Sequence, residues 1–320
     1  MRRGIALVVV LSVVTLLGVL TVATMMAVRG RMAGARRLRA VHGAALATRR
    51  TLDSALAAWP RDDRAGMPVG ASLSLASADP MRVTRLGRRL YRLDAATARG
   101  DALAPARHAA SLLVWIDRPT VDVRAPLVAG DAVVVGGEFA LGGSPPISGC
   151  ELVAPRVADV VAADTTRVRW DGSAGAMRQD ASLAASGAFE RLGTLSLDSL
   201  EARADLVLPD GAHWSPSDSA RLVVARGDLT LGAGKGRGLL VVRGRLVVEG
   251  PLSFAGLVLV LGGVTFAGDD VALSGMLRVR GPATLDRRGT LRADPCALDD
   301  ALALVGRAVP VGWWAYGPLR

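Results

Sequence analysis

Residues 223–231 read VVARGDLTL, residues 241–248 read VVRGRLVV, residues 259–266 read LVLGGVTF and residues 278–285 read RVRGPATL. In each segment a short apolar run leads to a glycine and then to more apolar residues. The aligned glycines are Gly227, Gly244, Gly262 and Gly281, at spacings of 17, 18 and 19 residues. Short strands joined by glycine corners at a nearly fixed interval are typical of chains that stack turn upon turn and bury their apolar side chains between turns. We therefore predict a β-solenoid-like domain over residues 121–296, with glycines turning the corners at positive φ; a β-sandwich is the alternative.

The repeat weakens on both sides of these four segments. Residues 121–127 and 129–135 each resemble one turn of the stack, and residues 143–220 are predicted to interrupt it as an insertion. After the repeat, residues 297–320 are predicted to form a C-terminal helix followed by an aromatic cap. That cap, Trp313, Trp314 and Tyr316, would close the open end of the stack; an anchor for a partner or for the membrane interface is the alternative.

The chain before the repeat is predicted to combine a helix with a small sheet. Residues 61–120 read as a small α+β region, with short strands at 67–77, 81–86, 88–95 and 111–116. Residues 29–60 predict an amphipathic stalk helix that ends at Pro60. Its apolar stripe, at helical spacing, is Leu38, Val41, Ala45, Leu52, Leu56 and Trp59. The predicted fold class is thus α+β, mainly β: a long N-terminal helix, a small β-sheet region and a β-solenoid-like stack of short strands.

Residues 5–28 form an uncharged apolar run of 24 residues, IALVVVLSVVTLLGVLTVATMMAV. A helix of that length spans about 36 Å, enough to cross a hydrocarbon core of ~30 Å. A cleaved secretory signal has a shorter apolar core that is closed by small residues, and this run has no A-x-A site after it. We therefore predict a single transmembrane helix that stays in the mature protein.

The residues before this run form a short basic leader, Met1-Arg2-Arg3-Gly4, followed by Ile5-Ala6-Leu7-Val8. This start resembles that of type IV pilin-like proteins, and most closely the PilX-like pilus-assembly proteins with their R-G-x-A-L-V beginning. The segments Gly227-Asp-Leu-Thr-Leu231 and Gly238-Leu-Leu-Val-Val242, and a cysteine before a closing helix, are also similar to that family. The resemblance implies a leader at 1–4, cleaved between Gly4 and Ile5 by prepilin peptidase. It further implies contacts with other pilin-like subunits.

One position departs from the major pilins of that family. They carry a glutamate as the fifth mature residue, where this chain has Val9. In a filament core the glutamate can pair with a neighbouring amino terminus, and valine cannot. The departure favours a minor pilin, a pseudopilin or an assembly component over a major pilin.

The arginines around the apolar run give a conflicting signal about orientation. Two arginines precede the run and five follow it closely, Arg29, Arg31, Arg36, Arg37 and Arg39. Arginine-rich flanks are usually retained in the cytoplasm, which would place the C-terminal part there. The resemblance requires the opposite orientation, and we predict that one: a single-pass protein of the inner membrane with a periplasmic or extracellular C-terminal domain.

Composition and charge exclude several classes of function. The 320 residues are 51% hydrophobic and 21% charged, which excludes a mostly disordered chain. The net charge of +10 comes almost wholly from residues 1–50, which hold nine arginines and no acidic residue. Because residues 51–320 are nearly neutral, a basic groove for nucleic acid is not expected.

Candidate chemical sites are also weak. The glycine-rich stretch 232–238 lacks the Ser or Thr that must follow the lysine of a phosphate-binding loop. The three histidines are scattered, and no metal-binding spacing of Cys or His occurs. Cys150 and Cys296 would form a disulfide in an exported domain or stay as two buried thiols otherwise. We expect no catalytic residues, no metal, no cofactor and no small-molecule substrate.

These features predict a membrane-anchored pilin-like structural or assembly component of a type IV pilus or a related secretion filament, with membrane lipid as a second partner. The alternative is a β-solenoid scaffold that is tethered to the membrane outside any filament. A third class is a periplasmic carbohydrate-active enzyme on a β-helix, which would need carboxylates or arginines clustered on one face of the solenoid, and only a structure can show such a cluster.

Overall fold

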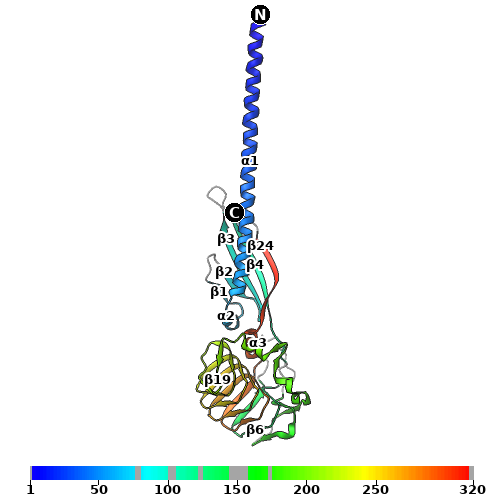
Figure 1. Cartoon of the computed structure of the whole chain (residues 1–320), viewed down its shortest axis with the longest axis vertical. Coiled ribbons are helices and arrows are strands. Elements are labelled where there is room, and N and C mark those ends of the chain that lie inside the picture. The colour runs from blue at the N-terminus through cyan, green and yellow to red at the C-terminus, as the bar shows by residue number, and fades with distance from the viewer. Residues whose placement is uncertain are drawn as a thin grey trace.

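The structure is a computed structural model that describes residues 2–75, 81–99, 106–121, 125–143, 158–171 and 175–316. It is an α+β fold, mainly β, with a long N-terminal helix and several sheets. Figure 1 shows the three parts in line: helix α1 projects away from the rest of the chain, an antiparallel sheet packs along its lower end, and parallel sheets form the far end.

Helix α1 runs without a break from Arg2 to Ala58. It joins the apolar run and the predicted stalk in one rod. It ends one residue before Trp59, because Pro60 disfavours helical geometry at the residue before it. A short helix, α2 (Arg61–Gly66), follows at once.

The antiparallel sheet has the strand order β1-β2-β3-β4-β24. Its strands β2 to β4 alternate buried and more exposed residues, so one face is buried against α1 and the other is open. The four strands predicted before residue 120 are present, and the fifth comes from the C-terminus. The bounds are β1 (Ser72–Leu75), β2 (Met81–Arg85), β3 (Leu90–Arg99), β4 (Ala106–Asp117) and β24 (Arg307–Tyr316).

That fifth strand corrects the prediction of a helix and aromatic cap over 297–320. Helix α4 (Pro295–Ala303) is short, and β24 then pairs antiparallel with β4 over its whole length. Trp313 and Trp314 are 44% and 50% exposed on this outer strand, far from the open ends of the parallel sheets. The pairing with β4 satisfies the backbone of β24, which a cap at the other end would not do.

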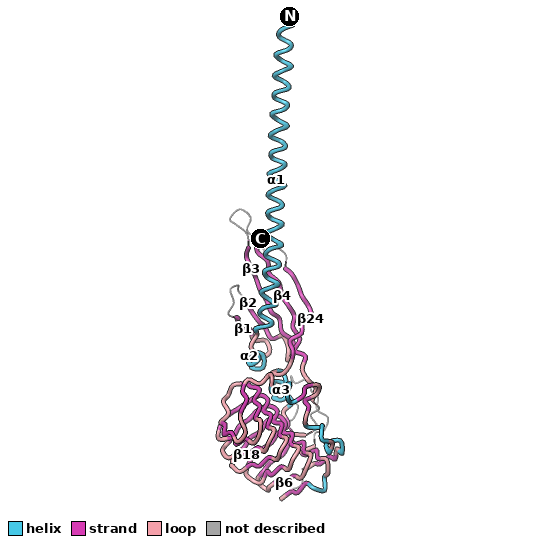
Figure 2. Tube along the Cα trace, in the orientation of Figure 1, coloured by secondary structure: helices cyan, strands magenta, loops and turns pink. Residues whose placement is uncertain are grey.

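The far end consists of two parallel sheets between which the chain alternates; we call them together the stack (Figure 2). The larger sheet has the order β10-β8-β5-β21-β19-β17-β15-β13, with β23 and β7 beside that path, and the smaller has the order β14-β16-β18-β20-β22-β6-β9. From β13 to β22 each strand pairs in parallel with the strand one repeat later, as Leu229 with Leu246 and Leu246 with Val264. At the end of this series β21 and β22 pair instead with the earlier strands β5 and β6. The bounds are β5 (Leu127–Ala129), β6 (Val133–Val135), β7 (Phe139–Gly143), β8 (Val160–Ala162), β9 (Val168–Trp170), β10 (Met177–Gln179), β13 (Leu206–Leu208), β14 (Ala212–Trp214), β15 (Ala220–Ala225), β16 (Leu229–Leu231), β17 (Gly234–Val242), β18 (Leu246–Val248), β19 (Leu252–Val260), β20 (Val264–Phe266), β21 (Val271–Val279), β22 (Ala283–Leu285) and β23 (Gly289–Ala293).

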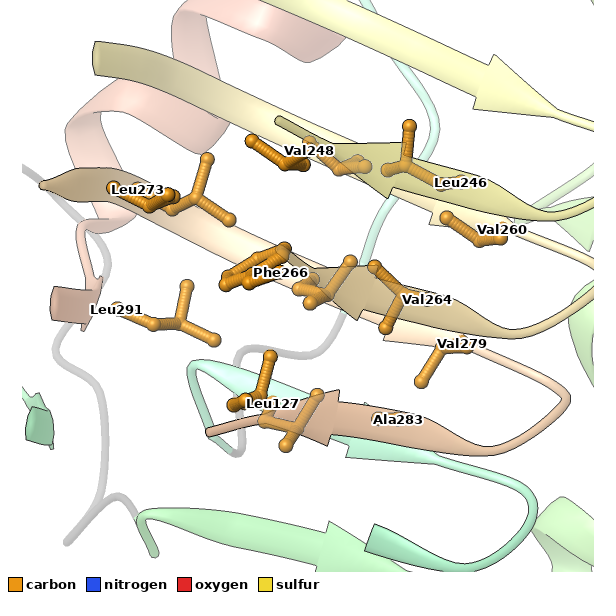
Figure 3. Packing of buried hydrophobic residues seen from close by; sticks show 14 of the residues in the cluster. Leu127, Leu246, Val248, Val260, Val264, Phe266, Leu273, Val279, Ala283 and Leu291 are labelled. Carbon is orange, nitrogen blue, oxygen red and sulfur yellow. The ribbon is translucent and has the colours of Figure 1, made fainter. Parts of the chain in front are cut away.

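The core of the stack lies between its two sheets. In Figure 3, Val260 and Val279 of the larger sheet and Val264 and Phe266 of the smaller one point into the same layer. The short strands β16, β18, β20 and β22 each bury their first and last residue. Because a strand of three residues buries so little alone, the core is formed by the stacking itself.

The described residues of the range 143–220 supply strands to both sheets, whereas the whole range was predicted to interrupt the stack as an insertion. β8 pairs with β5 and β9 with β6 at one end, while β13 and β14 pair with β15 and β16 at the other. Between these strands, residues 180–205 form short elements that bury Phe189, Leu192 and Leu200 in a second core with outward-facing residues of the larger sheet. These elements are η2 (Ala181–Ala184), η3 (Ser186–Phe189), β11 (Arg191–Leu192), β12 (Leu195–Ser196) and α3 (Leu197–Glu201). A further short helix, η1 (Thr165–Arg167), lies just before β9.

The four aligned glycines lie at the corners between a strand of the larger sheet and the next strand of the smaller one. Their φ angles are not in the positive region, so the reason for glycine is close approach. A Cβ on Gly262 would lie 2.5 Å from the Gly244 carbonyl oxygen, and one on Gly281 would lie 2.6 Å from that of Gly262. Successive turns approach too closely there for any side chain.

Positive φ occurs instead in a second glycine column, within the long strands of the larger sheet. Gly238, Gly256 and Gly275 have φ of +119°, +140° and +134° and are paired with one another in register. This column lies in the middle of the long strands, and Gly238 and Gly256 approach Leu304 and Ala301 at the end of α4.

Candidate membrane anchor and its attachment

The upper part of α1 exposes apolar side chains all round the helix. From Val10 to Val28 the larger apolar residues are about half to two-thirds exposed, for example Leu16 at 64% and Val19 at 68%. Among the described helices, α1 is the one long and apolar enough to cross a membrane. A helix that is apolar on every face and packs on nothing is stable in lipid rather than in water.

The hydroxyl groups in this segment are bonded inside the helix. Thr15 Oγ1 donates to the Leu11 carbonyl at 2.8 Å, and Thr21 Oγ1 donates to the Leu17 carbonyl at 2.7 Å. Thr24 does the same with Leu20 at 2.9 Å. Since an unbonded hydroxyl is costly in hydrocarbon, these bonds make the segment compatible with lipid on all sides.

The lower part of α1 packs on the antiparallel sheet and attaches the anchor to the rest of the chain. Leu52, Ala55 and Trp59 are buried in one core with Val83, Leu93 and Val114 and other sheet residues. Of the predicted stripe, Leu52 and Trp59 are buried, Val41, Ala45 and Leu56 are half-buried, and Leu38 is 62% exposed. The stripe therefore begins lower on the helix than its spacing predicts, because the sheet reaches only to about residue 40.

A buried polar cluster, which the apolar pattern does not reveal, lies in this interface. Thr48 is fully buried, and its Oγ1 lies 2.6 Å from Oγ1 of Thr97 on β3. Thr97 Oγ1 also donates to the Ala44 carbonyl at 3.0 Å, and Thr48 Oγ1 lies 3.3 Å from the His108 carbonyl of β4. These directional bonds fix both the rotation and the height of α1 on the sheet, which apolar contacts alone would leave adjustable.

The base of the helix is held by an aromatic and guanidinium cluster. The rings of Trp59 and Tyr91 meet edge to face at 4.9 Å, and the Arg64 guanidinium lies 5.2 Å from the Trp59 ring centre. Tyr91 Oη donates to the Arg64 carbonyl at 2.6 Å. Burial raises the pKa of Tyr91 above its ordinary value and lowers the pKa of Arg64 below its own. Both shifts come from desolvation, and they mark the cluster as a closed part of the core.

An ion-pair cluster joins the antiparallel sheet to the stack through α4. Asp299 of α4 is 4% exposed and pairs with Arg118, after β4, and with Arg88 at 3.6 Å. Arg89 lies at 4.0 Å from the same carboxylate, and Arg85 pairs with the neighbouring Asp300 at 3.4 Å. On its other side α4 packs on the larger sheet through Leu298 and Leu302. This joint sets the position of the stack relative to the anchor.

A second contact across the same joint uses backbone acceptors. Arg61 of α2 donates to the Arg203 carbonyl at 2.6 Å, and Arg203 in turn donates to the Val305 carbonyl at 3.1 Å. The helix base, residues 180–205 and the end of α4 are thereby linked in one chain of contacts.

The site residues predicted from the sequence lie in different parts of the molecule. Gly4 and Ile5 belong to the first turns of α1. Cys296 lies in the first turn of α4, where Asp294 caps the helix by accepting from its backbone N–H at 2.9 Å. Cys296 is disulfide-bonded. Cys150 lies outside the described residues, so its pairing with Cys296 stays a prediction.

The described residues offer little for chemistry. They contain no group of three or more His, Cys, Asp or Glu side chains close enough to hold a metal ion. A cleft of about 520 Å³ lies between α1 and the edge strand β1, lined among others by Thr51, Ser54, Leu73 and Leu75. Among its described lining residues the ionisable side chain is Asp63, so this cleft holds no acid–base pair.

Comparison with known proteins adds little to this description. No family model matches the sequence, and no curated protein matches it. Among solved structures, the crystal structure of the competence-associated pilin ComZ from Thermus thermophilus is similar over 88% of this chain and 98% of that chain, at 11% identity and a TM-score of 0.24. A TM-score of that size does not establish a common fold. Function must therefore be argued from this chain's own residues.

Proposed function

We propose that this chain is a membrane-anchored, pilin-like structural component that serves the assembly of a type IV pilus or of a related secretion filament. The observation that carries the proposal is the division of α1 into an upper part exposed and apolar on all sides and a lower part packed on an antiparallel sheet. A subunit of this form can be held in the bilayer by the upper part before assembly. The same surface can pack against other helices when it leaves the bilayer.

The leader sequence makes the proposal specific. Met1-Arg-Arg-Gly4 followed by an apolar run resembles the PilX-like pilus-assembly proteins, and prepilin peptidase would cut it after Gly4. The head would then lie outside the cytoplasm, with the anchor in the inner membrane. A disulfide at Cys296 supports this orientation, because disulfides persist in oxidising compartments. Cys150, the chain's other cysteine, would be its partner.

In this proposal the stack is a β-solenoid and acts as a presented surface, not as an enzyme. The in-register parallel pairing of β15 to β22 supports a solenoid. Its exposed turns would contact neighbouring subunits or partners outside the cell. The mechanism is physical: anchoring, packing and display.

The test is the mass of the N-terminal peptide of the protein isolated from membranes of its own host. Processing predicts a terminus at Ile5, carrying an added methyl group on its amine. A protein that keeps Met1 or Arg2 in a host with active prepilin peptidase would overturn the pilin proposal.

A second candidate is a membrane-tethered β-solenoid scaffold outside any filament. It is favoured by the five arginines that follow the apolar run, which the positive-inside rule would keep in the cytoplasm. A reporter fused after residue 60 separates the two, since periplasmic activity of the reporter would exclude a cytoplasmic scaffold.

A further inference from the structure

The helix between the apolar segment and the sheet carries a dense set of positive charges. Arg29, Arg31, Arg36, Arg37 and Arg39 are all exposed, and within the described residues none of them forms an ion pair. The chain has no acidic residue before Asp53, so nothing in the sequence nearby compensates this charge. We call these five residues the arginine collar.

The arginines of the collar are distributed round the helix. At 3.6 residues per turn, Arg31, Arg36, Arg37 and Arg39 lie at about 200°, 340°, 80° and 280° from Arg29. No empty sector is wider than about 120°. A docking site for one protein partner would gather charge on one face, whereas this distribution suits an environment that surrounds the helix on all sides.

The height of the collar matches the edge of a bilayer. The apolar run ends at Val28, and at 1.5 Å per residue Arg29 and Arg31 lie within about 5 Å beyond it, inside a headgroup layer roughly 5–8 Å thick. Arg36, Arg37 and Arg39 lie about 12 to 17 Å beyond Val28, within a Debye length or so of that layer. Side chains of a helix lean toward its N-terminus, which here is the direction of the membrane. Long arginine side chains can therefore reach back to the phosphates.

We propose that the arginine collar binds the phosphate groups of anionic phospholipids around the anchor. The proposal rests on the membrane anchoring of the proposed function and adds a lipid class as a partner. Guanidinium groups donate paired hydrogen bonds to phosphate, and basic residues next to a membrane helix are attracted to anionic leaflets. The bound lipids would hold the helix at a fixed depth while the subunit waits in the bilayer.

The test uses the full-length protein reconstituted in vesicles of phosphatidylcholine that contain about 30% phosphatidylglycerol as the anionic lipid. Spin-labelled phosphatidylglycerol and phosphatidylcholine are added separately. The motionally restricted fraction of each label gives their relative association with the protein. An attraction of about 1 kcal/mol per arginine at the surface corresponds to about a five-fold preference. We expect at least that preference for phosphatidylglycerol, and a marked fall when salt is raised, because salt screens exposed charges.

A matched pair of variants locates the effect. Arg29→Gln with Arg31→Gln should lower the preference several-fold, and replacement of all five collar arginines by Gln should lower it further, to what Arg2 and Arg3 alone retain. Arg49→Gln with Arg50→Gln removes the same two charges from exposed positions on the same helix, about 30 Å farther from the membrane. That control should keep the wild-type preference.

Three outcomes would overturn the proposal. They are equal association of the two lipids with the wild type, an unchanged preference in the variant that lacks all five collar arginines, and a loss of preference in the Arg49→Gln, Arg50→Gln control. The vesicles contain no pilus machinery, and N-terminal processing is measured separately. A failed collar and a failed pilin assignment are therefore distinguishable.

Discussion

Replacement of Gly256 by alanine should destabilise the stack severely. Gly256 has φ of +140°, and its missing Cβ would lie 2.0 Å from the Gly238 carbonyl oxygen and 3.1 Å from Cβ of Ala301. The unusual backbone angle costs a non-glycine residue about 1–3 kcal/mol. Ordinary contact would need the two strands to separate by more than about 1 Å, which weakens hydrogen bonds worth about 0.5–1.5 kcal/mol each. We expect a loss of about 3–5 kcal/mol in the free energy of unfolding.

The measurement is urea unfolding of the full-length protein in detergent micelles, followed by circular dichroism of the β-structure. Gly142→Ala, in β7 of the same stack, is the control, because a Cβ there meets nothing within 4 Å and its φ is not positive. The control should stay within about 1 kcal/mol of the wild type. A Gly256→Ala protein as stable as the control would refute the reasoning, since both the close approach and the backbone angle would then be without consequence.

Two further predictions concern the attachment of the anchor. Asp299→Asn should lower the free energy of unfolding by about 3–5 kcal/mol in the same assay, because it leaves the buried guanidinium of Arg118 without its carboxylate. The control Asp300→Asn, at a side chain 43% exposed, should lower it by less than about 1 kcal/mol. Equal losses of stability in the two variants would contradict the ion-pair cluster assigned to Asp299. The raised pKa of Tyr91 predicts that stability falls as pH rises above about 10, because the unfolded chain then releases a phenolic proton that the native state retains. Unfolding curves between about pH 9 and pH 12 should show this fall, at up to about 1.4 kcal/mol per pH unit, in the wild type and less of it in Tyr91→Phe. An identical pH dependence in the two proteins would mean that Tyr91 is not the group responsible.

The sequence predicted the elements whose signal is local. The long helix follows from an uncharged run and a helical stripe, and the strands of the stack follow from apolar segments at a nearly constant interval. The spacing also aligns the corner glycines, although close approach of successive turns, and not the predicted positive φ, requires glycine there. The second glycine column was missed, although Gly238, Gly256 and Gly275 recur at a similar interval, because they lie inside strands and not at their ends.

The features that were missed depend on contacts between distant residues. β24 reads as an apolar and aromatic tail, and its place beside β4 depends on a partner about 200 residues earlier. The strands β8 and β9 are three residues long and take their position from β5 and β6, with which they pair. Thr48 interrupts an apolar stripe, and its role as a hydrogen-bonding residue depends on Thr97, which lies opposite it only in the folded chain. The sequence pattern indicates a solvated Asp299, whereas in the folded chain this carboxylate is buried and paired with Arg88 and Arg118.

Two observations bear on the orientation of the chain, and they point in opposite directions. The arginine collar lies on the head side of the anchor, and counted alone it would keep the head in the cytoplasm. A disulfide at Cys296 is what an exported head would carry, because disulfides persist in oxidising compartments. The two facts are compatible if the collar has a partner outside the cytoplasm, because arginines bound to anionic headgroups are stable on that side once they have been translocated. The rule on arginine flanks concerns the insertion of helices, whereas the persistence of a disulfide depends on the compartment in which a folded head remains. The proposed function therefore combines a head outside the cytoplasm with a collar in the outer headgroup layer of the inner membrane.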